Sequence, residues 1–131
     1  IPPNLKGLSN KEEITKYYLS ERDADSSIVE PVNFTHILEI ETTTLQKYVN
    51  DNAINKIKLF KLEAEGFEPE ILEGSLGVLD MIEYIALDGG YERGKEQTET
   101  FSELCNVLQV HGFKMVTINF REYRALFVNK L

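Results

Sequence analysis

The sequence has few of the residues that stabilise secreted domains or anchor a chain in a membrane. It contains one cysteine, Cys105, which excludes an internal disulfide. Because Cys105 stands at a helical position among apolar residues, we interpret it as a reduced core thiol, and this predicts a cytoplasmic protein. No stretch approaches the ~20 consecutive apolar residues that a membrane-spanning helix needs, which excludes a membrane-spanning protein.

Basic residues are scarce relative to acidic ones. Fourteen Lys and Arg against 22 Asp and Glu give a formal net charge of -8, and no local basic run offsets it. Such a chain repels nucleic acid and anionic lipid, so neither is an expected partner. The two histidines, His36 and His111, lie on different expected elements without another ligand at metal-binding spacing, so no metal site is predicted.

What the sequence does contain is the pattern of one α/β domain over residues 1–131. Strand patterns occur in "ITKYYLS" and "HILEIET", which we expect to pair antiparallel as an excursion within residues 1–42. Residues 43–131 are expected to form an α/β core. Its strands are "INKIKLFKLEA", "MIEYIALD", "FKMVTIN" and "YRALFVN", and the last two are predicted to form an antiparallel terminal pair.

Three helices are expected between these strands. The first carries Leu45, Tyr48 and Val49 behind capping threonines. The second starts near Pro69 and is broken by Gly74 and Gly77. The third is "TFSELCNVLQVHG", with Thr100 and Glu103 in a capping-box pattern. The segment "GGYERGKEQ" before it is predicted to be a mobile polar loop.

Acidic residues gather where one predicted strand passes into a helix, in "KLEAEGFEPEILEGS". The "KLFKL" and "YIAL" strands are predicted to be parallel neighbours, because a helix connects them. The segments "EAEGFE" and "DGGYERG" then follow their strands at one edge of the sheet, where open α/β sheets bind ligands. Glu68, Glu70 and Glu73 are expected to be solvated helix acids.

These motifs resemble the second half of the FkbM family of S-adenosylmethionine (SAM) dependent methyltransferases. Residues that match its strand-to-helix signature are Lys61, Glu65, Gly66, Glu68, Leu72 and Gly74, while Glu63 stands where the family usually has Asp. The resemblance implies a partial Rossmann-like, SAM-methyltransferase-type mixed sheet with flanking helices. It also implies SAM as the cofactor, with Leu8 and Ser9 as cofactor-binding residues.

The same resemblance places the main cofactor-binding half, with its Gly-containing turn, before Ile1. No Gly-rich turn precedes a helix in these 131 residues, so we expect the chain by itself not to bind SAM. The expected assembly is a homodimer, because a sheet cut away from its neighbouring strands leaves an edge to cover. The early hairpin is the alternative cover for that edge.

Under this resemblance, Glu63 and Glu65 are the candidate catalytic residues, one orienting an acceptor hydroxyl or acting as general base. The alternative for Glu65 is a structural clamp on backbone N–H groups. Asp88, Glu92 and Arg93 are candidate substrate-binding residues, and a plain loop ion pair is the alternative. The predicted function is O-methylation of a small-molecule or sugar hydroxyl. The alternative function is a non-catalytic α/β interaction or assembly module.

Overall fold

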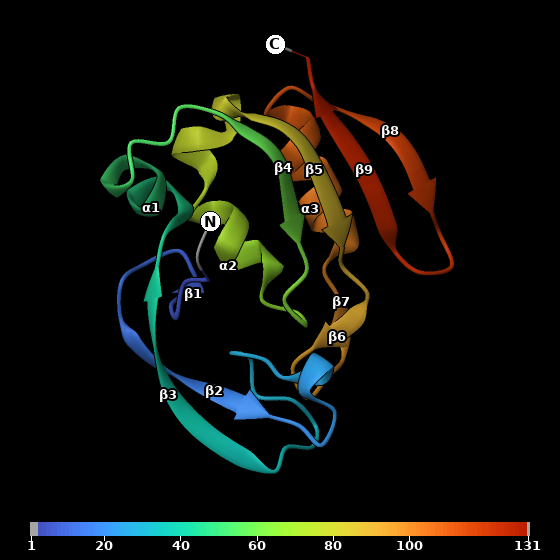
Figure 1. Cartoon of the computed structure of the whole chain (residues 1–131). Helices are drawn as coiled ribbons and strands as arrows, with labels where there is room; N and C mark the ends of the chain where they lie inside the picture. Colours follow the sequence, from blue (N-terminus) through green and yellow to red (C-terminus); the bar gives the residue numbers. More distant parts are fainter. Residues whose placement is uncertain (1–2, 131) are drawn as a thin grey trace.

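The computed structural model describes residues 3–130 as a mixed α/β structure with two main sheets (Figure 1). The strands and helices, in chain order, are β1 (Gly7–Leu8), β2 (Ile14–Leu19), η1 (Asp23–Asp25), β3 (His36–Thr43), α1 (Leu45–Asp51), β4 (Ile57–Leu62), α2 (Glu68–Glu73), η2 (Leu76–Met81), β5 (Ile82–Asp88), β6 (Tyr91–Arg93), β7 (Thr98–Glu99), α3 (Phe101–Val110), β8 (Phe113–Asn119) and β9 (Arg124–Asn129). The predicted fold class is confirmed.

The larger sheet has four strands in the order β4-β5-β9-β8. Strands β4 and β5 are parallel, with Leu62 opposite Leu87 at their carboxyl ends. Strand β9 is antiparallel to both of its neighbours, β5 and β8. The predicted parallel pair and the predicted antiparallel terminal pair are therefore both confirmed, and the carboxyl ends of β4 and β5 share one edge.

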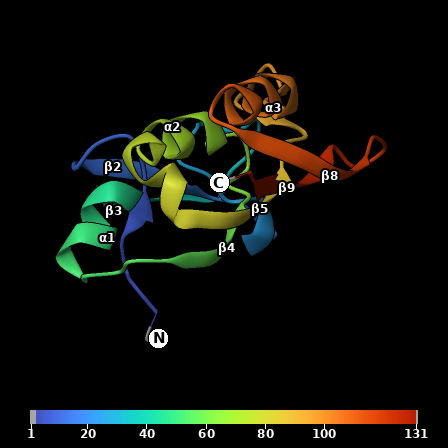
Figure 2. The same cartoon turned by 90° about the horizontal axis from the view of Figure 1, so that it is seen from above.

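Helices α2 and α3 lie on the same face of this sheet (Figure 2). The core lies between them and the sheet, and it includes Ile85, Leu108 and Phe127, each with 0% of its surface exposed. Burying one such side chain contributes about 1.5–3 kcal/mol relative to leaving it exposed. Among the described residues no helix covers the opposite face, where Leu59 is 55% exposed.

The smaller sheet has the order β1-β3-β2 and forms the lower part of Figure 1. Strands β2 and β3 pair antiparallel over their whole length, from Ile14 opposite Glu41 to Leu19 opposite His36, as predicted. The two-residue strand β1, which runs parallel to β3, was not predicted. The hairpin of β2 and β3 does not pair with β4, so the alternative in which it covers the β4 edge by strand pairing is wrong.

Two local predictions also need correction. The predicted mobile loop after β5 contains a short antiparallel hairpin, β6 with β7. The capping box of α3 does not form, because the Thr100 hydroxyl donates to Glu68 instead of binding a helix N–H group. By contrast, Thr44 does cap α1, accepting a hydrogen bond from the Lys47 N–H group at 3.0 Å.

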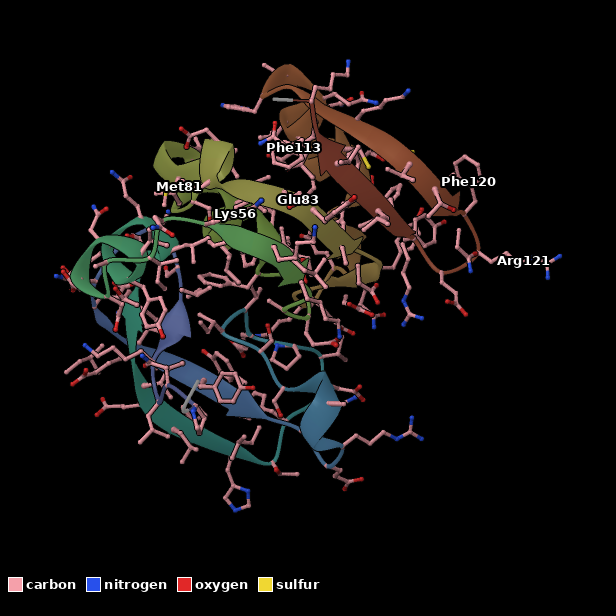
Figure 3. All side chains as sticks on the ribbon, turned by 45° about the horizontal axis from the view of Figure 1, so that its top comes forward. Lys56, Met81, Glu83, Phe113, Phe120 and Arg121 are labelled. Atoms are coloured by element: carbon pink, nitrogen blue, oxygen red, sulfur yellow. The ribbon has the colours of Figure 1, made fainter. Side chains whose placement is uncertain are left out.

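At the opposite end of the β4–β5 pair from the shared edge, basic and acidic side chains neutralise one another. Lys56 and Glu83 point toward each other (Figure 3), and their ion pair is 3.1 Å long. Lys58 also contacts Glu83. In the described part of the chain, no helix is both long and apolar enough to cross a bilayer.

Candidate functional site

The turn after β4 is packed directly against the hairpin strand β6. A Cβ atom added to Gly66 would lie 2.4 Å from the Arg93 Cα atom, so only glycine permits this approach. The Arg93 guanidinium donates to the Gly66 carbonyl oxygen at 2.5 Å. The segments "EAEGFE" and "DGGYERG" therefore meet at one edge, as predicted from their positions after parallel strands.

Within this turn Glu65 and Gly66 both have left-handed backbone conformations, with φ of 50° and 93°. A non-glycine residue at positive φ is strained and persists only where its surroundings hold it. Glu68 Oε1 accepts hydrogen bonds from the N–H groups of Ala64 and Gly66, at 2.7 Å and 3.1 Å. From the smaller sheet's side, the Ser27 hydroxyl donates to the Glu65 carbonyl oxygen at 2.9 Å.

These contacts overturn the expectation of solvated helix acids for Glu68 and Glu70, whereas Glu73 is exposed as expected. Glu68 is fully buried rather than solvated, and its second oxygen accepts from the Thr100 hydroxyl at 2.9 Å. Glu70 forms a bidentate ion pair with Arg93, at 2.6 Å and 2.9 Å. Glu73 binds the Asn10 amide. The backbone clamp considered for Glu65 exists, but the clamping carboxylate is that of Glu68.

Glu65 is therefore left to face another carboxyl group, that of Glu92. Burial raises the pKa of Glu65 to about 7, with further contributions from the charges of Glu92 and Asp25 and from a hydrogen bond to Glu92. Partial burial, together with the charges of Asp88 and Glu68, also raises the pKa of Glu92. Two carboxyl groups in contact share a proton, because both cannot ionise freely side by side.

Glu63 and Glu65 border a pocket of about 580 Å³ between the smaller sheet and the carboxyl end of β4. This volume is within the usual range for small-molecule sites, roughly 300–1,000 Å³. Apolar side chains form much of the remaining wall: Leu8, Ile28, Ile40, Phe67 and Ile71. Tyr17 adds a phenol. Polar residues also line the pocket, among them Lys6, Ser26 and Ser27, so a partly apolar wall with both donors and acceptors suits a ligand that has hydroxyl groups and apolar surface.

The structure brings some of the predicted site residues together and separates others. Leu8, Glu63 and Glu65 line the same pocket, and Glu92 touches Glu65. Ser9 does not line it: the residue is 1% exposed, and its N–H group donates to the Thr43 carbonyl oxygen.

Asp88 and Arg93 do not form one wall with Glu92. Asp88 accepts a hydrogen bond from Arg124 at 2.5 Å, in a neighbouring hollow of about 480 Å³ that Glu63 also borders. Arg93 is engaged by Glu70 and by the Gly66 carbonyl oxygen. The ion pairs considered as the alternative thus exist for both residues, but with partners on α2 and β9.

Three residues that shape the site were not singled out for it from the sequence: Ser27, Glu68 and Thr100. Ser27 and Thr100 lie 38 and 32 positions from their partners in the turn. For Glu68 the helix-start position before Pro69 did not indicate this role, because its carboxylate binds N–H groups of the turn before α2 and not those of the helix start. Within residues 3–130 no group of three or more potential metal ligands is found.

Glycine turns that bring a backbone close to a nucleotide leave an opening that a Cβ atom would fill. In the described residues, the space next to the closely packed glycines is already occupied by other parts of the chain. Added Cβ atoms would meet Arg93 at Gly66, the Ser9 carbonyl oxygen at Gly74 (2.0 Å), and the Phe101 N atom at Gly89 (3.0 Å). These turns pack the chain against itself and do not fit the nucleotide part of a cofactor.

Comparison with known protein families identifies the family of this chain. Residues 4–115 match the model of the methyltransferase FkbM domain. No curated protein and no solved structure matches the chain significantly. The matched range includes the β2–β3 hairpin, the strand-to-helix turn with Glu63, Glu65 and Glu68, and all of α3.

Proposed function

The chain belongs to the FkbM methyltransferase family, and from this we propose that it forms the acceptor side of a SAM-dependent O-methyltransferase. The proposed acceptor is a hydroxyl group of a small molecule or sugar. The observation that carries the proposal is the Glu65–Glu92 carboxyl pair at the edge of a pocket large enough for such a molecule.

The pair suits the proton chemistry of O-methylation. A hydroxyl oxygen becomes a good nucleophile as its proton leaves, and a base works best when its pKa is near the working pH. Glu65 has a pKa of about 7, so at pH 7.5–8 most of its carboxyl groups are ionised and able to accept that proton. Glu92 lies within hydrogen-bonding reach of Glu65, so it holds the acquired proton by sharing it.

Glu63 has a different role in this proposal. Its carboxylate is paired with Lys61, so it is less available as a base than Glu65. It lies at the border of the two hollows, where it is suited to bind a second hydroxyl group of the acceptor. Holding the acceptor at two points aligns the reacting oxygen, and alignment accounts for much of the rate in such transfers.

The family implies a methyl donor, and SAM is the proposed one. Because the close-packed glycine turns do not fit its nucleotide part, we assign to the described residues only the binding and deprotonation of the acceptor. A cytoplasmic location is part of the proposal. It is supported by Cys105, a buried free thiol whose pKa burial raises to about 11, so that it stays neutral and unreactive.

The proposal is tested by methyl transfer from radiolabelled SAM with the complete gene product and a panel of sugars and small alcohols. Glu65→Gln should lower kcat by roughly 100-fold or more, since general bases contribute about 10²–10⁴. The pH–rate profile of the wild type should rise through about pH 7 as Glu65 ionises. Glu96→Gln, which removes an exposed acid in the β6–β7 turn, is the matched control and should keep full activity.

Two results would argue against this function. Label transferred to an amine or thiol, but not to a hydroxyl, would rule out O-methylation. Full activity of Glu65→Gln would remove the proposed base. If no acceptor is methylated at all, the non-catalytic module becomes the better explanation. Such a module transfers no methyl group, so it needs no base at the pocket.

A further inference from the structure

Glu68 is a fully buried carboxylate for which the proposed chemistry has no use. It lies at the first position of α2, and none of its surface is exposed. One oxygen accepts from the N–H groups of Ala64 and Gly66, and the other accepts from the Thr100 hydroxyl. A buried carboxylate is tolerated when its oxygens are hydrogen-bonded in this way.

The two N–H groups that Glu68 binds belong to the residues on either side of Glu65. Residue 65 is therefore held between two anchored peptide groups, in a left-handed conformation that a glutamate does not favour by itself. The Ser27 hydroxyl fixes the carbonyl oxygen of Glu65 from the smaller sheet. These three hydrogen bonds fix the backbone around residue 65, so the Glu65 side chain starts from a fixed position.

The second oxygen of Glu68 connects this turn to the segment that follows β5 at the same edge of the sheet. Thr100 precedes α3, and the N–H groups of Thr100 and Phe101 both donate to the Gly89 carbonyl oxygen, at 3.2 Å and 3.0 Å. Gly89 directly follows β5 and lies three residues before Glu92. Glu68 thus joins the segment that carries Glu65 to the segment that carries Glu92.

We propose that Glu68 is the positioning residue of this site: its buried carboxylate sets the contact between Glu65 and Glu92 by bonding the turn that carries Glu65 directly and the segment that carries Glu92 through Thr100. The inference rests on the proposed function only in giving that contact a catalytic use. Glu68 does not border the pocket, so it acts through Glu65 and does not touch the acceptor.

The test compares variants at both ends of this connection in the 131-residue chain. Glu68→Gln keeps an oxygen for the two N–H groups and an amide for Thr100, so the contact should survive. Glu68→Ala removes both links. Thr100→Val removes only the hydroxyl link, and Thr100→Ser keeps it as the matched control. The readout is the pKa of the Glu65 carboxyl group, followed by carbon-detected nuclear magnetic resonance during a pH titration.

The wild type, Glu68→Gln and Thr100→Ser should all titrate Glu65 well above the ordinary glutamate range. In Glu68→Ala and Thr100→Val its pKa should fall by roughly one unit or more, as expected when a carboxyl group loses a like-charged neighbour. If Glu68→Ala does not fold, Thr100→Val against Thr100→Ser decides the question. An unchanged Glu65 pKa in Thr100→Val, and in any folded Glu68→Ala, would overturn the proposal.

A second readout connects positioning with catalysis. In the complete gene product, Thr100→Val should lower kcat by about tenfold with little change in KM, because misplacing a base weakens the transition state more than acceptor binding. The rising limb of its pH–rate profile should also move to lower pH. If no methyl transfer occurs in the wild type, the proposed function fails, while the titration still decides the role of Glu68.

Discussion

At the scale of single residues, the site depends on two glutamates of one turn with opposite surroundings. Glu68 accepts three hydrogen bonds from N–H and hydroxyl donors, which is a suitable environment for a carboxylate. Glu65, three residues earlier, faces the acids Glu92 and Asp25, and burial with these charges raises its pKa. The same residue type thus has a structural role at position 68 and titrates near neutral pH at position 65.

The raised pKa predicts how stability depends on pH. Between pH 4.5, the ordinary value, and about 7, folded Glu65 keeps a proton that the unfolded chain releases. The free energy of unfolding should therefore fall as the pH rises through this range. Glu65→Gln should remove part of that fall, by about 1 kcal/mol after allowing for solvent screening of a half-exposed group.

Urea unfolding of the wild type and Glu65→Gln at pH 5 and pH 8 measures this difference. Glu96→Gln changes the net charge by the same amount from an exposed position, so it controls for the general effect of an acidic chain. Parallel stability curves for Glu65→Gln and the wild type would show that the proton is not held at this position.

At the scale of elements, the close contact between the turn after β4 and strand β6 builds the edge of the larger sheet where Glu65 and Glu92 lie. Gly66 and Gly112 both have positive φ, 93° and 90°, but their surroundings differ. A Cβ atom at Gly66 would collide with the backbone of Arg93, whereas one at Gly112 has no atom within 4 Å. Alanine substitutions at these two glycines therefore separate the free-energy cost of backbone strain from the cost of lost packing.

Gly112→Ala should lower the free energy of unfolding by about 1 kcal/mol, the cost of placing alanine at positive φ. Gly66→Ala carries the same strain and must also push β6 away from the turn, so its cost should reach about 3 kcal/mol or more. Chemical denaturation of both variants gives the comparison. Equal losses of unfolding free energy in the two variants would mean that β6 moves aside without cost. The contact between Gly66 and Arg93 would then not stabilise this edge of the sheet.

At the scale of the whole molecule, one face of the larger sheet and one edge of β4 have no cover among residues 3–130. On that face Leu59 lies opposite Tyr84, and Tyr84 lies opposite Val128. The lysines of β4 are engaged by acids of the same chain, since Lys58 pairs with Glu83 and Lys61 with Glu63. With its charges balanced, this surface is suited to apolar contact.

We propose that two copies of the chain associate through this face or edge, as a twofold dimer. Light scattering at several protein concentrations should give a mass that rises toward twice 15.0 kDa. Leu59→Lys should shift the equilibrium to the monomer. Val110→Lys, which adds the same charge on α3 at a residue 84% exposed, should not. A monomer mass at every concentration would exclude the dimer.

The sequence alone determined the order and type of the main elements. The "IKLFKL" and "IEYIALD" runs lie where strands form, Thr44 caps a helix, and Pro69 lies in a first helical turn, because each of these signals is local. Parallel pairing of β4 and β5 also followed, since a chain that crosses through a helix returns in the same direction. From that pairing came the shared edge that holds Glu63, Glu65 and Glu92.

Only the tertiary structure decided what each acid at that edge does. Glu65 and Glu68 look alike in the sequence, and their roles depend on Ser27, Glu92 and Thr100, which the fold brings from 27 to 38 positions away. Arg93 and Glu92 are adjacent in β6, yet Arg93 contacts α2 while Glu92 contacts the turn. Burial and neighbouring charge set the chemistry of a carboxyl group, and both are properties of the packed chain.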